Sequence, residues 1–249
     1  MLPGADAVAD VLATAVVDVV DGARAAGRAA RLGVATGRSP RQAYQRLAAR
    51  VRSGWAVDPR TALVLLDEYL DLPREHPAVF RNVIEHELAA PLGLGPDRVL
   101  GPDPWSDDLD TECRRVEALV ADGGIDLQIL GIGRNGHIAF NEPGTPFDSR
   151  AHVVDLAPAT RLDAARAFGS LESTPRRAIT QGIATILTAR RIVLVALGEH
   201  KAAAVRAAVV GPQTAATPAS ALRDHPTVVV LLDAAAASGL DTEVSGLGS

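Results

Sequence analysis

A histidine and a glutamate stand close together in a glycine-rich segment near the middle of the chain. The segment runs from Leu130 to Gly144 and holds His137 and Glu142. It follows an apolar run, residues 125–130, which is typical of a buried parallel strand. Glycines let backbone approach a ligand closely, and an imidazole beside a carboxylate can move protons. The pattern favours an active-site loop, although a capping histidine with a solvated glutamate explains this loop equally well.

The same glycines match the spacing of a dinucleotide-binding fingerprint. Gly131, Gly133 and Gly136 form G-x-G-x-x-G, and Asp155 follows at about the expected distance. That fingerprint requires a helix that begins at its third glycine. Here Pro143 follows soon after, and proline stops a helix. The sequence therefore disfavours a nucleotide site at these glycines.

A second candidate site follows the short apolar run 32–34. A helix is expected over 41–52, with Ser39 as its N-cap and Pro40 just inside it. A strand, a tight turn and a helix start commonly bind phosphate, because free amides and the helix dipole both attract an anion. The residues of this turn are Thr36, Gly37, Arg38 and Ser39. An ordinary helix cap explains them equally well.

Two carboxylates, Asp67 and Glu68, end the apolar run 62–66. Carboxylates at the carboxyl end of a core strand are costly to hold unless they are paired or used in chemistry. A surface turn is the alternative interpretation, and the residues themselves do not decide between the two.

Apolar runs alternate with amphipathic segments along the chain. Strands are expected over 32–34, 62–66, 125–130, 152–156, 192–197 and 228–232. Helices are expected over 5–29, 41–52, 82–90, 108–121, 176–187 and 201–209. This alternation predicts a single α/β domain with one doubly wound, mostly parallel sheet flanked by helices. Ligands bind beyond the carboxyl ends of the strands in such sheets, so Thr36, Asp67, His137 and Gly198 are expected to meet there.

Composition excludes several classes of protein. The 249 residues are 47% hydrophobic, enough for a sizeable core, and no linker or repeat divides them. A net charge of -5 with scattered arginines argues against nucleic acid as a partner. The single Cys113 excludes an intramolecular disulfide and a cysteine metal cluster, and no metal site is expected. We expect a cytoplasmic protein without a membrane span or secretory leader. Formation of a homo-oligomer stays open.

Taken together, the motifs resemble the glucosamine-6-phosphate deaminase family. The resemblance runs in the expected order through residues 36–40, 66–69, 131–144, 197–201, 218–220 and 225–226. The segment G-H-I-A-F-N-E-P is the most specific part, and the related 6-phosphogluconolactonases typically lack its F-N-E-P. The resemblance implies conversion of glucosamine 6-phosphate and water to fructose 6-phosphate and ammonia, without a redox cofactor.

The resemblance also implies a role for individual residues. His137 would open the sugar ring, and Asp67 would move a proton from C2 to C1. Glu142 and Asn135 would orient the imidazole, although asparagine supplies no charge where some members carry aspartate. The phosphate would be bound by Thr36, Gly37, Arg38, Ser39, Arg166 and Lys201. Arg166 alone is typical of a solvated helix face, but residues 156–179 correspond to a mobile lid in the family.

Two departures from the family pattern bear on assembly and regulation. The chain begins Met-Leu-Pro-Gly and goes almost directly into helix, so an amino-terminal edge strand is expected to be absent. Members activated by N-acetylglucosamine 6-phosphate carry basic residues where this chain has His152 and Val154. Such activation is therefore not expected, unless Arg150 or Arg161 rebuilds an anion site. The alternative functions are a galactosamine-6-phosphate deaminase, a 6-phosphogluconolactonase-like hydrolase and a non-catalytic sugar-phosphate sensor.

Overall fold

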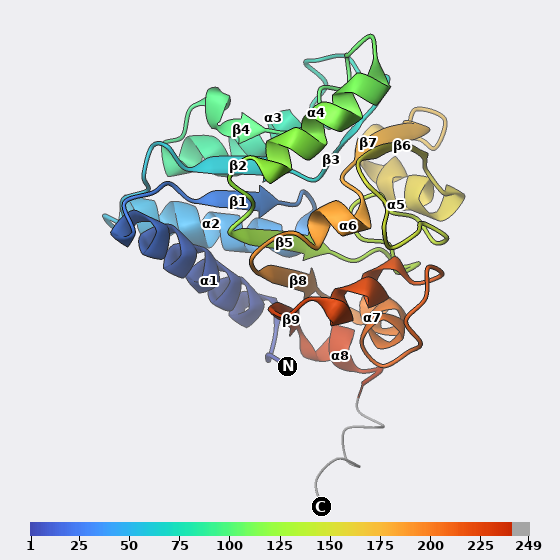
Figure 1. Cartoon of the computed structure of the whole chain (residues 1–249). Coiled ribbons are helices and arrows are strands. Elements are labelled where there is room, and N and C mark those ends of the chain that lie inside the picture. The colour runs from blue at the N-terminus through green and yellow to red at the C-terminus, as the bar shows by residue number, and fades with distance from the viewer. Residues whose placement is uncertain (241–249) are drawn as a thin grey trace, which may run out of the picture.

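Two sheets organise residues 1–240, the part of the chain that the computed structural model describes (Figure 1). Six parallel strands form the larger sheet in the order β4-β2-β1-β5-β8-β9. They are β1 Arg31–Val34, β2 Ala62–Leu65, β4 Val99–Leu100, β5 Leu127–Gly131, β8 Ile192–Ala196 and β9 Val228–Leu232. The smaller sheet is antiparallel, in the order β3-β7-β6. Its strands are β3 Asp67–Tyr69, β6 His152–Asp155 and β7 Arg177–Thr180.

Helices connect most of these strands. They are α1 Ala5–Ala25, α2 Arg38–Arg52, α3 Phe80–Ile84, α4 Leu109–Ala121, α5 Pro158–Phe168, α6 Ile183–Ile186, α7 Ala202–Val209 and α8 Ala234–Ala237. The third helix continues through a π turn, Glu85–Ala89, into a 3-10 turn, Ala90–Leu92. Further 3-10 helices are Pro96–Arg98, Glu199–Lys201 and Pro218–Asp224. No helix of residues 1–240 is long and apolar enough to cross a membrane.

The strand order of the larger sheet reverses between β1 and β5. From β1 the chain moves outward to β2 and β4, and it then returns to β5 and moves the other way to β8 and β9. A crevice opens beyond the carboxyl ends of the two strands at such a reversal. In Figure 1 the smaller sheet and α5 lie beyond the arrowheads of β1 and β5. The smaller sheet therefore borders the crevice in which a ligand is expected.

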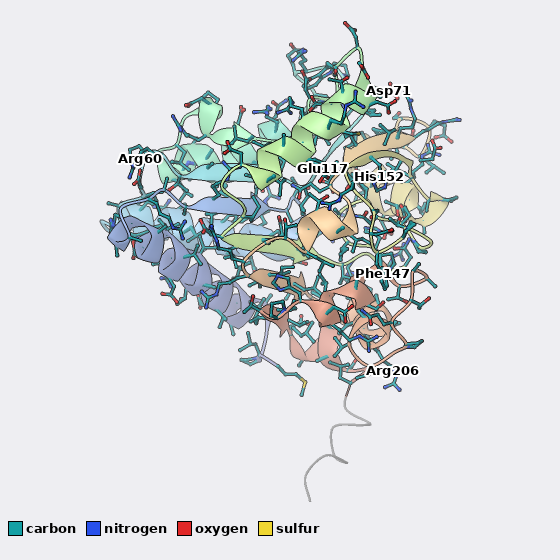
Figure 2. All side chains as sticks on the ribbon, in the orientation of Figure 1. Arg60, Asp71, Glu117, Phe147, His152 and Arg206 are labelled. Atoms are coloured by element: carbon teal, nitrogen blue, oxygen red, sulfur yellow. The ribbon has the colours of Figure 1, made fainter. Side chains whose placement is uncertain are left out.

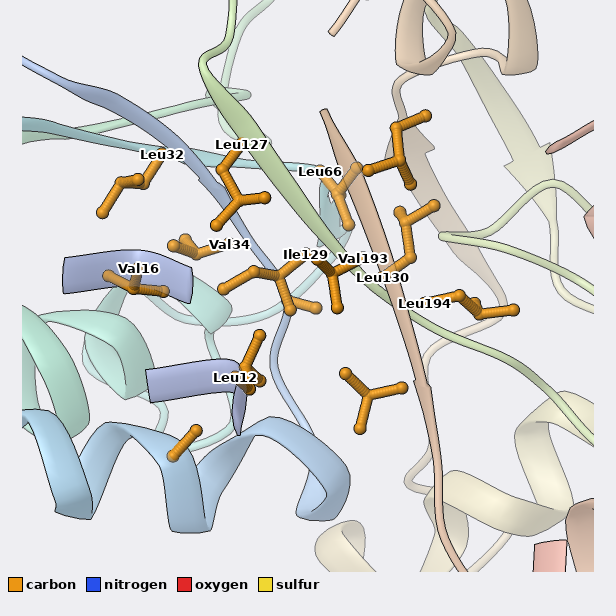
Figure 3. Packing of buried hydrophobic residues seen from close by; sticks show 14 of the residues in the cluster. Leu12, Val16, Leu32, Val34, Leu66, Leu127, Ile129, Leu130, Val193 and Leu194 are labelled. Carbon is orange, nitrogen blue, oxygen red and sulfur yellow. The ribbon is translucent and has the colours of Figure 1, made fainter. Parts of the chain in front are cut away.

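The first helix holds one face of the larger sheet. Leu12 and Val16 are at most 1% exposed, and Figure 3 shows them beside Val34 and Ile129 of the two central strands. Burial of such a side chain stabilises the fold by about 1.5–3 kcal/mol. This packing fixes the strands whose ends carry the loops of the crevice.

A carboxylate of α4 holds the smaller sheet in place at the beginning of β6. Glu117 accepts a hydrogen bond from the backbone N–H of Ala151 at 2.6 Å, directly before β6 begins, and another from the hydroxyl of Thr185 in α6. Figure 2 labels Glu117 and His152 at this junction. The start of β6 is thus held by a side chain of the helix that packs beside it.

Most of the predicted elements are confirmed, including the parallel sheet at the centre of the fold. Two predictions for the smaller sheet were wrong. Residues 152–156 do not join the parallel sheet, because β6 pairs with β7 in antiparallel register. Residues 176–187 do not form one helix, since β7 precedes α6. Ala178, Ile179 and Thr180 are fully buried between β3 and β6, so pairing on both sides decides their conformation over the helical pattern.

The ends of the chain's first elements also differ from expectation. Helix α2 begins at Arg38 with Gly37 as its N-cap, so Ser39 lies inside the helix and does not cap it. The φ of Gly37 is 113°, a conformation that only glycine adopts readily, and the N-cap therefore lies two residues earlier than predicted. Before α1, Leu2 forms a single parallel bridge with Asp233 in place of an edge strand. The short β4 was not predicted.

Candidate active site

The loop after β5 folds around the side chain of His137. The N–H of Gly133 donates to the carbonyl of His137 at 2.9 Å, and a Cβ added to Gly133 would lie 2.3 Å from the imidazole. Gly136 has a φ of 84°, and its carbonyl accepts a hydrogen bond from the N–H of Ala219. No helix begins at Gly136, as predicted from Pro143. The absence of a side chain at Gly133 therefore lets the backbone lie directly against the histidine ring.

Polar groups converge on Nδ1 of His137. Oε2 of Glu142 lies 3.7 Å away and the hydroxyl of Thr160 lies 3.4 Å away. The side-chain amide of Asn135 donates to the same Oε2 at 2.8 Å, and its carbonyl oxygen accepts from the His137 N–H at 3.2 Å. Burial lowers the pKa of His137 and outweighs the opposing attraction of Glu142. The imidazole is therefore neutral at pH 7 and able to accept or pass on a proton.

The carboxylate of Glu142 also reaches the beginning of α5. Its Oε1 accepts a hydrogen bond from the N–H of Ala157 at 3.1 Å, one residue before that helix. Thr160, on the first turn of α5, is the second contact of this helix with the histidine loop. Thr160 was not among the predicted site residues.

Two neighbouring carboxyl groups with perturbed pKa values stand at the end of β2. Burial raises the pKa of the half-buried Asp67 well above its usual range, and the charge of Glu68 raises it further. Glu68 is buried and accepts hydrogen bonds from the N–H groups of Tyr69, Phe80 and Arg81 at 2.9–3.0 Å. Burial outweighs these bonds and raises the pKa of Glu68 to about 7. Of the two, Asp67 is the group free to act, because Glu68 is occupied by backbone.

Strand β7 connects Asp67 to the histidine loop. Asp67 pairs in register with Thr180, whose hydroxyl accepts a hydrogen bond from the N–H of Phe140 at 3.2 Å. Gln181 donates to the carbonyl of Leu65 at 2.9 Å and accepts at its own backbone carbonyl from the side chain of Asn141. The carboxylate and the imidazole are thus held in one hydrogen-bonded frame. Sequence reasoning missed Thr180 and Gln181, because this segment was expected to be helical.

A lysine places a positive charge in the same crevice. The ammonium of Lys201, just before α7, donates to the carbonyl of Ile132 in the histidine loop at 2.7 Å. Burial lowers the pKa of Lys201, Asp163 raises it, and both Arg134 and Arg38 lower it. The ammonium thus feels the charges of three side chains from other parts of the chain. Arg134 and Asp163 were not predicted as site residues.

The turn between β1 and α2 faces the same group of charges. No side chain of the described residues caps the amino end of α2, which leaves its first N–H groups open to a ligand. Thr36 and Gly37 form the turn, while Arg38 and Ser39 belong to the first turn of the helix. Cations near an uncapped helix start suit an anion, and the phosphate site predicted from the sequence stays a prediction.

Arg166 is the predicted residue that the structure does not bring to the others. It lies on α5, its side chain is exposed, and it makes no hydrogen bond or ion pair within residues 1–240. The helix that carries it nevertheless contacts the histidine loop through Thr160. Movement of α5 would be needed to bring Arg166 to Lys201.

The fold is that of a doubly wound α/β protein, and a buried imidazole, a raised-pKa carboxyl group and a lysine follow the carboxyl ends of its strands. The chain belongs to the family described as glucosamine-6-phosphate isomerases/6-phosphogluconolactonase, whose model matches residues 3–231. This membership confirms the resemblance inferred from the motifs, together with the predicted fold class.

Individual sequence relatives share one name within this family. The chain is 51% identical over 213 residues to a protein of Streptomyces avermitilis named glucosamine-6-phosphate deaminase, covering 85% of this chain and 82% of the relative. A relative of the same name from Mycolicibacterium smegmatis is 46% identical, covering 84% of this chain and 81% of its own length.

Solved structures agree with the sequence relatives. A structure described as a monomeric glucosamine-6-phosphate deaminase matches with a TM-score of 0.90 and 39% identity, covering 96% of this chain and 98% of its own. The 6-phosphogluconolactonase of Trypanosoma brucei matches with a TM-score of 0.74, 19% identity and 96% of both chains covered, which shows the fold alone.

Proposed function

We propose that the protein is a glucosamine-6-phosphate deaminase, which converts glucosamine 6-phosphate and water to fructose 6-phosphate and ammonia. The observation that carries the proposal is the grouping of His137, Glu142 and Asn135 with Lys201 at the carboxyl end of β5. A proton-transfer group and a phosphate-binding cation stand together there. The names of the sequence relatives support the same reaction.

His137 opens the sugar ring in this proposal. The reaction needs one group that protonates the ring oxygen and removes the proton of the C1 hydroxyl. A neutral imidazole does both in turn, because one ring nitrogen can accept the proton of the C1 hydroxyl and then pass the same proton to the ring oxygen. Glu142 and Thr160 contact Nδ1, so Nε2 is the nitrogen that faces substrate. Gly133 fixes the plane of the ring, since its missing side chain makes room for it.

Asp67 carries the following proton transfer. Its carboxylate removes the C2 proton of the open-chain amino aldehyde, whose C1 oxygen gains a proton to give an enolamine. Return of the proton to C1, with loss of a proton from the amino group, gives an imine at C2. Water then attacks the resulting C2 imine, the C–N bond breaks, and ammonia leaves. Burial of Asp67 raises its pKa and makes it a stronger base than an exposed carboxylate. No residue role in these steps requires a redox cofactor.

The phosphate of the substrate is placed against Lys201 and the amino end of α2. Thr36 and Ser39 add hydroxyl donors, Gly37 lets backbone approach, and Arg38 adds charge. We assign residues 156–179 as a lid, with Arg166 joining the phosphate when α5 moves inward. The single Cys113 and a sugar-phosphate substrate both suit the cytoplasm, where we place the protein, and we place its reaction in amino-sugar catabolism.

An assay across several substrates tests the assignment. Ammonia release is measured with glucosamine, galactosamine and N-acetylglucosamine 6-phosphates, and hydrolysis is measured with 6-phosphogluconolactone. Turnover of glucosamine 6-phosphate at the highest kcat/KM is the expected result. A higher kcat/KM for the galactosamine compound or for the lactone would replace the proposal with that activity. Binding without turnover of any of the four compounds would identify a sensor.

A further inference from the structure

An arginine outside the predicted site pairs with the helix assigned as a lid. Nε of Arg134, in the loop after β5, donates to Oδ2 of Asp163 in α5 at 2.9 Å, and a second guanidinium nitrogen contacts Oδ1. The two side chains are 48% and 39% exposed. This forked geometry is the one that a guanidinium adopts with a carboxylate or a phosphate.

The pair stands at the candidate phosphate site. Lys201 donates to the carbonyl of Ile132, two residues before Arg134 in the same loop. The charges of Arg134 and Arg38 disfavour the ammonium of Lys201, and the charge of Asp163 favours it. Lys201 thus interacts electrostatically with Asp163, Arg134 and Arg38, in the place where a phosphate is expected.

The arrangement of α5 gives that carboxylate a defined position. Thr160 and Asp163 are three residues apart, and therefore lie on the same side of the helix. Thr160 contacts His137, and Asp163 contacts Arg134 in the same loop. The exposed Arg166 follows Asp163 by three residues, about one turn further along the helix. The side of α5 that contacts the histidine loop thus carries an acid, one turn before the predicted phosphate-binding arginine.

We propose that Arg134 is a further phosphate-binding residue, and that Asp163 competes with the phosphate of the substrate for its guanidinium. The inference rests on the phosphate site assigned under the proposed function. A phosphomonoester carries about two negative charges against the single charge of a carboxylate, so it is the stronger partner for a cluster of three cations. Its arrival transfers Arg134 from Asp163 to phosphate, which frees Asp163 from the loop. A sugar without phosphate has nothing to exchange and leaves the pair in place.

Charge-neutral variants distinguish this exchange from an ion pair that only holds α5 against the loop. Asp163→Asn, Arg134→Gln and the double variant are compared with the unaltered protein, by KM for glucosamine 6-phosphate and by the inhibition constant of inorganic phosphate. We expect Asp163→Asn to lower both constants by about 2–5-fold, since a competing surface charge of this kind is worth up to about 1 kcal/mol. We expect Arg134→Gln to raise both by about tenfold. The double variant should follow Arg134→Gln, because Asp163 then has no guanidinium for which to compete.

Two matched variants control for net charge alone. Asp155→Asn and Arg176→Gln make the same charge changes at exposed positions that have no side-chain partner within residues 1–240. Both should leave the two constants unchanged. Equal effects in these controls would overturn the proposal. A KM that rises or stays constant in Asp163→Asn would also overturn it. If the ion pair only held α5 in place, breaking it would weaken substrate binding and raise KM.

Lys201→Ala tests the assigned phosphate site independently of the role of Arg134 and Asp163. If Lys201→Ala raises KM while the Arg134 and Asp163 variants have no effect, the inference is wrong and the site stands. If Lys201→Ala also leaves KM and phosphate inhibition unchanged, the assigned phosphate site itself is wrong.

Discussion

Asn135 donates its side-chain amide to Oε2 of Glu142 over 2.8 Å, and the same oxygen lies 3.7 Å from Nδ1 of His137. The amide orients the carboxylate without placing a second negative charge beside the imidazole. A carboxylate at position 135 would favour the protonated ring, whereas the amide leaves burial as the dominant influence on the pKa of His137. The asparagine thus helps to keep the imidazole neutral and ready to accept a proton.

Asp67→Asn should remove turnover and leave substrate binding nearly intact. The amide keeps the shape of the carboxyl group but cannot accept the C2 proton, so kcat is expected to fall by about 10²-fold or more. Steady-state kinetics and exchange of the C2 proton with solvent measure the loss. Asp71→Asn is the matched control, because Asp71 lies just beyond the same strand, is exposed and pairs with Arg177. Exchange at the unaltered rate in Asp67→Asn would remove Asp67 from the mechanism.

The pH dependence of kcat/KM should show an acid limb well above the usual pKa of a carboxyl group. Burial and the charge of Glu68 raise the pKa of Asp67. A base with a raised pKa is protonated over a wider acidic range, so activity is lost as pH falls through that raised value. The limb should barely move with temperature, as expected for a carboxyl group, whereas an imidazole limb moves strongly. A limb near pH 4 would contradict the burial of Asp67 during turnover.

Lys201→Ala should raise KM with little change in kcat. The phosphate lies away from the reacting carbons and is bound equally in ground and transition states, so its cation contributes uniform binding. A charge-assisted contact of this kind is worth roughly 1.5–3 kcal/mol, which corresponds to about 10–100-fold in KM. Arg166→Ala should raise KM as well, and should also lower kcat if α5 closes over the substrate. Arg176→Ala, an exposed arginine at the other end of the lid, is the comparison in which KM stays constant.

Asp126→Asn should destabilise the fold without changing kcat per folded molecule. Asp126 is 4% exposed, accepts from Arg28 at 2.8 Å and from the Arg31 N–H at 2.9 Å, and pairs with Arg190 at the amino ends of the strands. The two guanidiniums are half-exposed, so the loss should be about 1–3 kcal/mol. Urea unfolding measures it, with the exposed Asp97→Asn as a control that shows little change.

The same carboxylate predicts a dependence of stability on pH. Burial opposes ionisation of Asp126, but the hydrogen bonds from Arg28, Arg31 and Arg190 outweigh it and hold its pKa below the usual value. A folded-state pKa below the unfolded value means that the stabilisation is present above about pH 4 and is lost as pH falls through the folded pKa. Unfolding of Asp126→Asn should therefore depend less on pH over this acidic range than unfolding of the unaltered protein.

Kinetics in glucosamine 6-phosphate should be hyperbolic and unaffected by N-acetylglucosamine 6-phosphate, except for competition at high concentration. A phosphorylated activator needs a second anion site that favours one conformation. Arg150 is instead paired with Glu117 at 3.4 Å, and the guanidinium of Arg161 donates to backbone carbonyls of the lid. Initial rates with and without the acetylated sugar test this. A sigmoidal curve that the acetylated sugar makes hyperbolic would show that an activator site exists.

Local sequence patterns predicted the central sheet and the strand ends at which the candidate site lies. Short apolar runs such as 125–130 and 192–197 favour buried strands, and the glycines and proline around His137 disfavour a helix after β5. Parallel strands share one carboxyl edge, so Thr36, Asp67, His137 and Gly198 follow strands that end at the same crevice. These features depend on local pattern and on the topology of parallel sheets, and both can be read from one chain.

The smaller sheet, and the contacts between α5 and the loop after β5, depend on packing between segments far apart in the sequence. Thr180 takes its strand conformation from Asp67 and His152, which lie on either side of it and far away in sequence. Arg134 and Asp163 likewise belong to a loop and a helix that are far apart in sequence. No local pattern shows that these two side chains will meet. Residues 176–187 carry a helical periodicity, but burial between two strands outweighs the weak preference of a short segment.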